Sequence, residues 1–290
     1  MKIQLARAEG HPATPHPRPG NAIDQLIRQL NQAREVTIGF PAATDFDYTA
    51  YSELFAKHPL NNIGDPYTPG TWRGHTKTEE RHVVDFCADL FRAPADDRWG
   101  YVTAGGSESN LYALHLGRTL LPKAVCYFSD AAHYSIEKHR RLLSLPAVRI
   151  RTDPYGEIDY DDLHTQISLR RDRPAIVVAT IGTTMSEAID DVRRITAILD
   201  DLAVRERFLH ADAALAGIPL GLLDPTDRPG FDFADGADSI AVQDTSSSAR
   251  PCPAASCSPE THTAPKRREP STTSAARTPP SPALDPVTHR

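Results

Sequence analysis

The sequence predicts an α/β fold in which helices cover both faces of a mostly parallel β-sheet. Between residues 99 and 242, short apolar runs alternate with longer segments whose apolar residues recur at helical spacing. A helix placed between two strands returns the chain to the edge where the next parallel strand begins. The runs are apolar along their whole length, which is typical of strands buried on both faces.

The chain before residue 99 is less regular. A helix is predicted over 21–35, with Asn21 as its N-cap. Its apolar residues stand at helical spacing: Ile23, Leu26, Ile27 and Leu30. Residues 37–76 are rich in Gly, Pro, Asn and aromatic residues but too apolar for a linker. We expect packed irregular structure there, with one short helix near 48–57.

A further helix is predicted over 78–91, and the alternating pattern follows it. The buried side of this helix is expected to carry Val83, Val84, Phe86 and Leu90. A strand and turn are expected at 99–106, and further strands at 124–129, 147–152, 174–182, 207–214 and 238–242. Helices are expected between the first five strands, at 107–121, 134–145, 158–171 and 188–203.

The composition changes abruptly after residue 242. Pro, Ser and Thr make up about half of residues 244–290, and the large aliphatic residues of this segment are Leu284 and Val287 alone. Such a segment cannot bury enough apolar surface to offset its ordering entropy. We therefore expect a disordered leader at 1–20, an N-terminal segment at 21–75, an incomplete large domain at 76–242 and a disordered tail at 243–290.

Composition and charge argue against several function classes. The formal net charge of −6 does not favour nucleic acid or an acidic membrane surface as a partner. The sequence has no apolar run of signal-peptide type and none long enough to span a membrane. Two cysteines lie in apolar elements and two in the tail, which favours neither a disulfide framework nor a metal site: Cys87, Cys126, Cys252 and Cys257. We expect a cytoplasmic protein without a bound metal.

The stretch "TAGGSESN", residues 103–110, joins a strand to a helix. Gly105 and Gly106 permit a tight turn, and Ser107 can cap the helix. Free N–H groups and the positive end of the helix dipole suit this turn to a phosphate group. An ordinary capped turn without a ligand is the alternative interpretation.

Three other motifs fall at the ends of predicted strands. Asp212 in "HADAA" is a carboxylate that could bind a cationic ligand, or else cap a helix or lie on the surface. His133 in "DAAHYS" could be catalytic or only structural, and the hydroxyls of "TIGTT", 180–184, could serve a site or a turn. Because the carboxyl ends of parallel strands share one edge of the sheet, we expect all four motifs to converge there.

Together these motifs resemble the pyridoxal-phosphate-dependent group II amino-acid decarboxylases. The similar stretches include "ADLFRAPADDRWGYVTAGGSESNLYALHLGR", "YFSDAAHYSIEKHRRLL", "GEIDYDDL", "IGTTMSEAIDDVRRI", "LHADAALAG" and "FDFADGADSIAV". Bacterial histidine decarboxylases are most similar, and plant serine decarboxylases look similar too. The resemblance implies the fold type I of pyridoxal-phosphate enzymes, with residues 76–242 as the cofactor-binding large domain, and pyridoxal 5'-phosphate as cofactor.

The resemblance also implies how the cofactor is held. The turn would bind its phosphate through Gly105, Gly106, Ser107 and Glu108. Asp212 would pair with the pyridinium nitrogen, so that the ring accepts electrons. Ala214 would pack against one face of the ring, and Thr183 or Thr184 would line the site.

The same resemblance implies the contacts to an amino-acid substrate. His133 would stack on the cofactor ring, lie close to the substrate and act catalytically together with Asp212. The loop 58–67, with Asn62, would contribute substrate contacts. Enzymes of this fold are usually homodimers with the active site at the subunit interface, so we expect a dimeric parent enzyme.

One residue that the chemistry needs is missing. In the family, a lysine that holds the cofactor as a Schiff base follows the strand that corresponds to "DSIAV", within a segment such as Ser-Gly-His-Lys-Phe. Here the residues after that strand are Gln243, Asp244, Thr245, Ser246 and Ser247. The six lysines of the chain lie elsewhere, and Lys138 is expected to be an exposed helix residue: Lys2, Lys57, Lys77, Lys123, Lys138 and Lys266.

A shifted reading frame accounts for the missing lysine. Codons for Val242 to Cys252 can be chosen such that one T inserted after the Val242 codon yields Val-Ser-Gly-His-Lys-Phe-Leu-Gly-Ser-Pro-Met. The frame then continues to Pro-Cys-Gly-Val-Val-Leu-Thr-Arg-Asp, which is again similar to the family. Our hypothesis is a single-base deletion, in the gene or in its sequencing, that replaces the rest of the protein by out-of-frame peptide.

The sequence leaves three functions open. The favoured one is decarboxylation of an amino acid to its amine, with histidine to histamine first and serine or another small amino acid second. The second is a non-catalytic fragment, because the chain as written lacks the lysine. The third is another pyridoxal-phosphate enzyme of the same fold, such as an aminotransferase or lyase. The residue sequences of the motifs "HADAALAG" and "DAAHYS" disfavour it.

Overall fold

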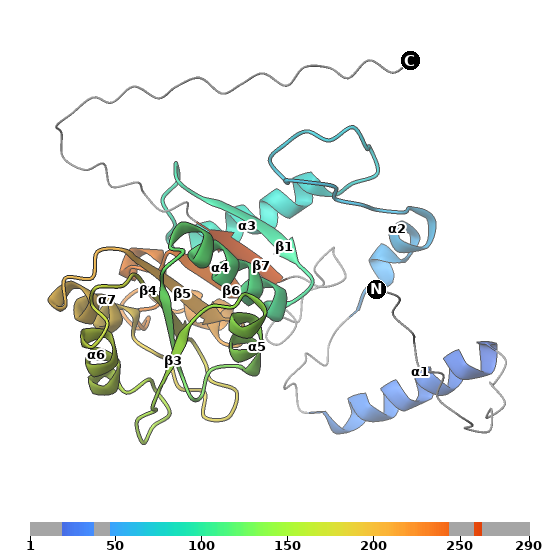
Figure 1. Ribbon diagram of the computed structural model, residues 1–290. Coiled ribbons are helices and arrows are strands. Elements are labelled where there is room, and N and C mark those ends of the chain that lie inside the picture. The colour runs from blue at the N-terminus through green and yellow to red at the C-terminus, as the bar shows by residue number, and fades with distance from the viewer. Residues whose placement is uncertain (1–18, 38–46, 244–257, 263–290) are drawn as a thin grey trace, which may run out of the picture.

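The computed structural model describes residues 19–37, 47–243 and 258–262 (Figure 1). Its seven-stranded sheet has the order β1-β7-β6-β5-β4-β2-β3. The strands are β1 (Trp99–Thr103), β2 (Val125–Ser129), β3 (Ala147–Ile150), β4 (Ala175–Thr180), β5 (Arg207–Ala213), β6 (Ser239–Val242) and β7 (Ser258–His262). All six strands expected from the sequence are present, and the α/β fold class is confirmed.

The helices between the strands also follow the prediction. They are α3 (Lys77–Leu90), α4 (Gly106–Leu120), α5 (Tyr134–Leu142), α6 (Tyr160–Ser168), α7 (Val192–Asp201) and the short α8 (Gly217–Gly221). Two short elements, η1 (Thr49–Tyr51) and α2 (Ser52–Lys57), form the helix expected near 48–57. Among the helices described, none combines the length and the apolar character that a bilayer crossing demands.

Strand β7 is the one strand here that the sequence does not predict. The pairs β3–β2, β2–β4, β4–β5 and β5–β6 are parallel, whereas β7 runs antiparallel to both β6 and β1. It corrects the expectation of a wholly disordered tail, because backbone N–H and C=O groups can pair with a sheet edge whatever the side-chain composition. The rest of that tail, 244–257 and 263–290, and leader residues 1–18 lie outside the described residues.

Alternate residues of the strands face two separate apolar clusters, as the pleat of a strand requires. On β4, Val177 and Ala179 pack with residues of α3, α6 and α7, while Ile176 and Val178 pack with Leu114 of α4 and Ile136 of α5. The two clusters therefore lie on opposite faces of the sheet. On β5, Phe208 belongs to the cluster beneath α4 and α5, so the residues two and four positions further also face α4.

Helix α4 lies very close to the sheet. A Cβ atom at Gly117 would come within 2.9 Å of Phe208 and 3.2 Å of Ile176. The lack of a side chain at Gly117 permits this approach without a shift of Phe208, and it brings the sheet-facing side of α4 against β4 and β5.

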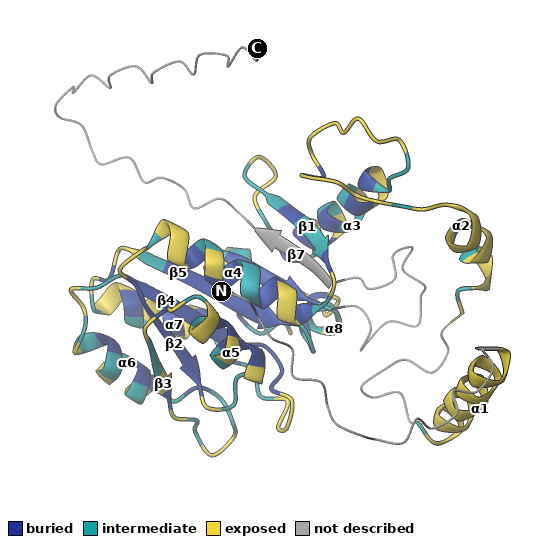
Figure 2. Cartoon of the chain, turned by 45° about the vertical axis from the view of Figure 1, so that its right-hand side comes forward, coloured by how far each residue is buried: buried dark blue, intermediate teal, exposed yellow. Residues whose placement is uncertain are grey.

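The N-terminal helix α1 (Pro19–Val36) confirms the predicted element but not its start. It begins two residues before Asn21, which is therefore not its N-cap, and proline is favoured in the first turn of a helix. The residues of its apolar face are 49–59% exposed: Ile23, Leu26, Ile27 and Leu30. Figure 2 shows this helix exposed along its length, in contrast to the buried strands.

Helix α3 also matches its prediction except at Phe86, whose side chain is exposed. The buried residues of this helix include Val84, Cys87 and Ala88, and Phe91 follows on the same face. These positions are three or four residues apart, and Phe86 lies outside that face because of the 3.6-residue period. The expectation that Phe86 is buried was wrong.

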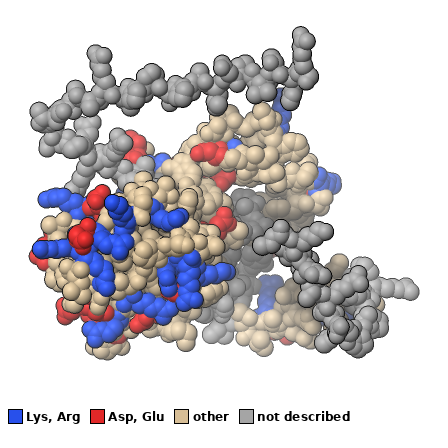
Figure 3. All heavy atoms as spheres, viewed as in Figure 1, with Lys and Arg blue, Asp and Glu red and all other residues tan. Residues whose placement is uncertain are grey.

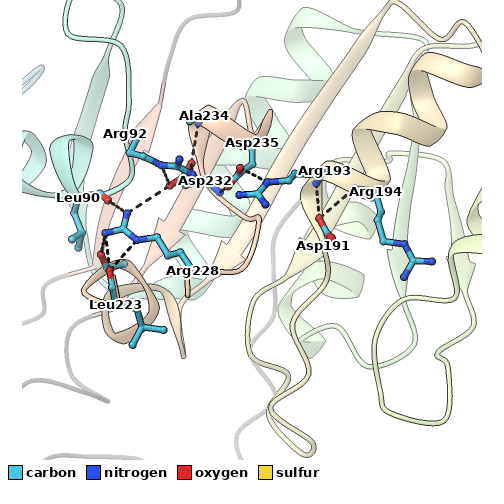
Figure 4. A network of polar contacts seen from close by, with 11 residues as sticks. Leu90, Arg92, Asp191, Arg193, Arg194, Leu223, Arg228, Asp232, Ala234 and Asp235 are labelled. Atoms are coloured by element: carbon cyan, nitrogen blue, oxygen red, sulfur yellow. Dashed lines mark hydrogen bonds and ion pairs between the residues drawn. The ribbon is translucent and has the colours of Figure 1, made fainter. Parts of the chain in front are cut away.

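A network of ion pairs anchors the turn η2 (Phe233–Asp235), which leads into β6 (Figure 4). Arg92, after α3, donates to both carboxylate oxygens of the fully buried Asp232, at 2.6 and 2.7 Å, and to Asp235 at 2.9 Å. Arg193 of α7 donates to Asp235 at 2.6 Å. A bidentate pair of this kind has a defined geometry, so the network holds α3, α7 and the start of β6 together.

Many Lys and Arg side chains gather on the face shown in Figure 3, with carboxylates between them. Glu137 of α5 accepts from Arg140 at 3.0 Å and also from Arg141, and Arg149 lies 3.6 Å away. The hydrogen bonds from Arg140 and then from Arg141 lower the pKa of Glu137 to about 2, although partial burial opposes them.

Replacing Arg92 by alanine is expected to lower the free energy of unfolding by about 2–4 kcal/mol, because Asp232 loses its bidentate partner while it remains buried. Urea denaturation followed by circular dichroism measures this loss. Lys57→Ala is the control, since its pair with Glu53 is exposed and contributes less than about 0.5 kcal/mol. Equal losses for the two variants would contradict the assignment.

The pKa of Glu137 predicts a pH dependence of stability. Its folded pKa lies below the unfolded value of about 4.3, so its contribution is present above that pH and is lost as the pH falls towards 2. Glu137→Gln should therefore be less stable than the unchanged chain at pH 6, and the difference should shrink as the pH falls from about 4.3 to 2. Urea denaturation at a series of pH values tests this, and a difference independent of pH refutes it.

Candidate functional site

A cavity lies at the carboxyl ends of β4, β5 and β6, beside the first turns of α4 and α5. Ligands bind at this edge in open α/β sheets, because the loops that follow the parallel strands all emerge there. The cavity is lined by Gly106, Ser107, Asn110, His133, Thr180, Gly182, Thr184, Asp212, Ala214, Leu215 and Gln243. The predicted convergence of the four motifs is thus observed.

The glycine turn presents backbone to the cavity. A Cβ atom at Gly106 would lie 3.0 Å from the Ala214 Cβ and 3.2 Å from Gln243 Oε1, so a larger residue there would have to displace these neighbours slightly. Helix α4 begins at Gly106 with Gly105 as its N-cap, and no side chain caps it. Ser107 is therefore not the cap that the sequence predicts, because the helix starts one residue earlier.

The donors of this turn are partly used within the chain. The Gly106 amide donates to Gln243 Oε1 at 3.3 Å, whereas the Ser107 amide has no partner among the described residues. The Glu108 carboxylate turns back to accept from the Ala104 amide at 2.7 Å. Neither Glu108 nor Gly105 lines the cavity.

Asp212, at the end of β5, is a nearly fully buried carboxylate that lines the cavity. Its Oδ2 accepts from Asn110 Nδ2 at 2.8 Å, and its Oδ1 accepts from the Ala214 amide at 3.4 Å. Burial raises the pKa of Asp212, while the Asn110 hydrogen bond and the neighbouring His133 act in the opposite direction. The remaining lone pairs of this carboxylate can accept a hydrogen bond from a ligand.

His133 is the N-cap of α5, and its ring lies at the mouth of the same cavity. Its Nδ1 lies 2.8 Å from Ser135 Oγ and accepts from the Ser135 amide at 3.4 Å. The capping contact holds the ring, so His133 and Asp212 both border the space where a ligand would lie.

The "TIGTT" turn contributes Thr180, Gly182 and Thr184 to the cavity. The Thr180 Oγ1 atom is buried and has no hydrogen-bond partner in the described part of the chain. Thr183, in contrast, is buried within the turn, where its hydroxyl contacts Ser186 Oγ at 2.7 Å and accepts from the Ala188 amide at 3.0 Å. Of the two threonines considered, Thr184 lines the cavity and Thr183 does not.

The buried Asp190 shapes this turn. Its carboxylate accepts from the amides of Ile158 and Thr180, each at 2.7 Å, and burial raises its pKa to about 7. Gly182 adopts a φ of +90°, where a Cβ would also meet Ala216 at 2.8 Å. These constraints place Thr184 at the cavity.

Asn62 does not reach the cavity. Its amide nitrogen donates to Glu80 at 2.8 Å, and its oxygen accepts from the amide of Thr76 at 2.7 Å. Both ends of the Asn62 side chain thus hold the irregular loop onto the start of α3. These contacts join residues 14 and 18 positions apart, so the spacing of the sequence does not reveal them.

Four lining residues were not predicted from the sequence: Asn110, Gly182, Leu215 and Gln243. A signal was available for Asn110, which lies one turn after Gly106 on the side of α4 that also carries Ala113 and Leu114. A polar residue on a buried helix face requires a partner. Gln243 carried no such signal, because it lies at the start of the segment read as tail.

The geometry suits a flat aromatic cation that carries a phosphate. The turn offers amide donors for the anion, and Asp212 provides a buried carboxylate for a ring N–H. Ala214 and the His133 ring supply walls, and the unpaired Thr180 hydroxyl offers a further polar contact. The described residues contain no cluster of side chains suited to a metal ion.

Comparison with known families agrees with this geometry. The sequence model of the protein family described as "pyridoxal-dependent decarboxylase conserved domain" matches residues 75–246. The chain belongs to this family. The cofactor of the family, pyridoxal phosphate, is a flat aromatic ring with a phosphate and a ring nitrogen, and it matches the polar groups of the cavity.

Curated relatives of this chain are named histidine decarboxylase. The protein from Mesorhizobium japonicum is 47% identical over 78% of this chain and 60% of its own length. The protein from Morganella morganii is 39% identical over 77% of this chain and 58% of its own length. The chain thus spans less than two thirds of these relatives.

The decarboxylase fold is also found in a solved structure. L-Methionine decarboxylase from Streptomyces sp. 590 superposes with a TM-score of 0.72, at 22% identity, over 84% of this chain and 67% of that one. At this identity the likeness concerns the fold alone.

None of the described lysines of this chain lines the cavity. Lys77 is buried, and its ammonium group donates to the carbonyls of Asp65 and Thr68 at 2.9 and 3.1 Å. Lys138 is exposed on α5, as expected. Residue 246, where the shifted frame carries a lysine codon, lies outside the described residues.

Gln243→Ala should strengthen the binding of pyridoxal 5'-phosphate by about two- to tenfold, because it releases the Gly106 amide as a donor for the phosphate. Isothermal titration calorimetry measures the affinity. Gln166→Ala on α6 is the control, since Gln166 does not line the cavity. Unchanged or weaker binding by Gln243→Ala would contradict a competing role for this side chain.

Proposed function

We propose that this chain is the larger part of a pyridoxal-phosphate-dependent amino-acid decarboxylase whose substrate is histidine and whose product is histamine. The observation that carries the proposal is the buried Asp212 facing the same cavity as the Gly106 turn and His133. The names of the curated relatives support histidine as the substrate.

The proposed roles follow from position and charge. Gly106 and Ser107 bind the phosphate through amide donors, and Asp212 accepts the hydrogen bond of the protonated ring nitrogen. Ala214 and His133 pack against the ring faces, and Thr184 borders one edge. When bound, pyridoxal phosphate supplies the electron sink for the electron pair left when carbon dioxide departs.

Two features tune these residues for decarboxylation. Asp212 is enclosed, so its negative charge acts on the ring with little screening by water. His133 lies at the cavity and is placed to orient the substrate and to exclude water from the reacting carbon. Gly105, Glu108, Thr183 and Asn62 serve the turn and the loop around the site rather than the ligand.

We further propose that the chain as written is inactive, because the lysine that carries the cofactor is lost to a shifted reading frame. In the restored frame, the lysine codon takes the place of the Ser246 codon, four residues after β6 ends at Val242. The apolar run Val-Val-Leu then falls at codons 256–258, of which only the last lies in β7. The position of the lysine codon soon after β6 supports the frame hypothesis.

A non-catalytic protein is the second candidate, and the lack of any lysine at the cavity among the described residues favours it. Serine remains the alternative substrate, because substrate selectivity also depends on parts of the enzyme beyond this cavity. We propose that the complete enzyme is a homodimer, as the resemblance implies, and that it is cytoplasmic, as expected from the composition.

Inserting one T after the Val242 codon should produce a protein that releases histamine from histidine, whereas the 290-residue chain should give no detectable turnover. Amine release across a panel of amino acids, with serine included, measures both. In the restored protein, Asp212→Ala should lower kcat by at least about a hundredfold, since the charge beside the ring is lost.

Outcomes of this experiment discriminate between the candidates. Turnover by the 290-residue chain would refute the inactivity, and release of ethanolamine from serine in preference to histamine would refute the substrate. A gene sequence with no single-base restoration near codon 242 would refute the frame hypothesis. If the restored protein acts on no amino acid, the proposed decarboxylation is refuted and the non-catalytic candidate is favoured.

A further inference from the structure

Asn110 lies at the centre of a buried chain of hydrogen bonds that reaches both sides of the cavity. Its Nδ2 contacts Asp212 Oδ2 at 2.8 Å and Ser135 Oγ at 3.2 Å, and its Oδ1 contacts His210 Nε2 at 2.9 Å. His210 Nδ1 lies 2.8 Å from Ser239 Oγ. All five residues are at most 4% exposed.

The fold brings these residues together for simple geometric reasons. His210 and Asp212 follow Phe208 at intervals of two on β5, so all three face α4. Ser239 of β6 is the register partner of His210. The close approach of α4 at Gly117 then sets Asn110 against the strand end.

The chemistry of the groups determines the direction of each hydrogen bond. An ionised carboxylate accepts only, so the amide nitrogen of Asn110 must face Asp212. Its oxygen then faces His210, whose Nε2 must carry a hydrogen in order to donate. In the neutral ring Nδ1 accepts from the Ser239 hydroxyl, so every donor along this branch points towards Asp212.

The second branch reaches His133. The other N–H of Asn110 points to Ser135 Oγ, whose own hydrogen is therefore available for His133 Nδ1 at 2.8 Å. The Ser135 amide also donates to Nδ1. An Nδ1 that accepts two hydrogen bonds leaves the proton of the neutral imidazole on Nε2.

We propose that Asn110 is a positioning residue that keeps Asp212 an ionised acceptor and His133 in its Nε2–H tautomer, while His210 and Ser239 hold the Asn110 amide in the one orientation that serves both. The inference deepens the proposed function and, for its consequence on the cofactor, rests on it. No motif in the sequence assigns a role to Asn110, His210 or Ser239.

Among the groups around Asp212, Asn110 has the strongest influence in favour of the ionised carboxylate. The groups facing Asp212 come from four elements: Thr180 on β4, Ala241 on β6, Asn110 on α4 and His133 before α5. Burial raises the pKa of Asp212, and the Asn110 hydrogen bond is the strongest influence that lowers it. A rotated amide would bring its oxygen against the carboxylate and remove that influence.

The first measurement follows the carboxyl carbon of Asp212 by 13C NMR in the 290-residue chain without added ligand. Asn110→Leu removes both ends of the contact at similar volume and should raise the pKa of Asp212 by at least about one pH unit. His210→Leu should act in the same direction. His210→Gln, which retains a donor at the Nε2 position, should leave the titration close to that of the unchanged chain.

The second measurement is the affinity for pyridoxal 5'-phosphate as a function of pH. Protonation of Asp212 removes the acceptor for the ring N–H, so binding weakens as the pH falls through the pKa of Asp212. Asn110→Leu should therefore bind more weakly at any pH at which its Asp212 is more protonated than that of the unchanged chain, by up to about tenfold for a pKa rise of one unit, and should recover as the pH rises. The same titration in His133→Gln separates the contribution of that imidazole.

Thr196→Val is the control for packing, because Thr196 lies on α7 with a buried hydroxyl that has no partner in the described residues. It should change neither readout. If Asn110→Leu does not fold, the contrast between His210→Leu and His210→Gln decides by the same two measurements.

An Asp212 titration that is identical in the unchanged chain and in folded Asn110→Leu would overturn the proposal, as would equal behaviour of the two His210 variants. If the unchanged chain binds no pyridoxal 5'-phosphate but the Asp212 titration shifts as expected, the positioning role stands and the proposed cofactor site fails. The two ideas are thereby separated.

Discussion

A carboxylate buried at the end of a central parallel strand constrains the structure around it. Asp212 loses its hydration on folding and must receive hydrogen bonds in return, and Asn110 supplies the strongest of them. That contact requires α4 to lie close to β5, which Gly117 permits. The same approach places the Gly106 turn next to Ala214, so the glycine turn and the carboxylate at the two ends of the cavity depend on one helix position.

The polar groups of the site form a connected system rather than separate motifs. Asn110 joins the carboxylate of Asp212, the imidazole of His210 and, through Ser135, the imidazole of His133. Buried networks of this kind specify one arrangement when every member is satisfied. The Arg92–Asp232 network has the same character at the turn before β6, which carries Ser239 and ends beside Gln243.

The order of elements was predictable because parallel strands and their covering helices have distinct periods. The predicted strands and helices from Trp99 to Val242 are all present, and the glycine turn, His133 and Asp212 converge as expected. Where a side chain lies elsewhere than the sequence predicts, the cause is local. Thr183 turns into its own loop, Asn62 holds its loop to α3, and Phe86 lies outside the buried face of α3.

The sequence by itself determined the fold class, the motifs at the strand ends and the family, since these follow from periodicity and from residue order. The side chains that reach the cavity, by contrast, are set by tertiary packing. Asn110 acquires its partners from β5 and α5, which are distant in sequence, so no local pattern records the contact. Strand β7 depends likewise on the backbone edges of β1 and β6, because a strand is formed by pairing and not by composition alone.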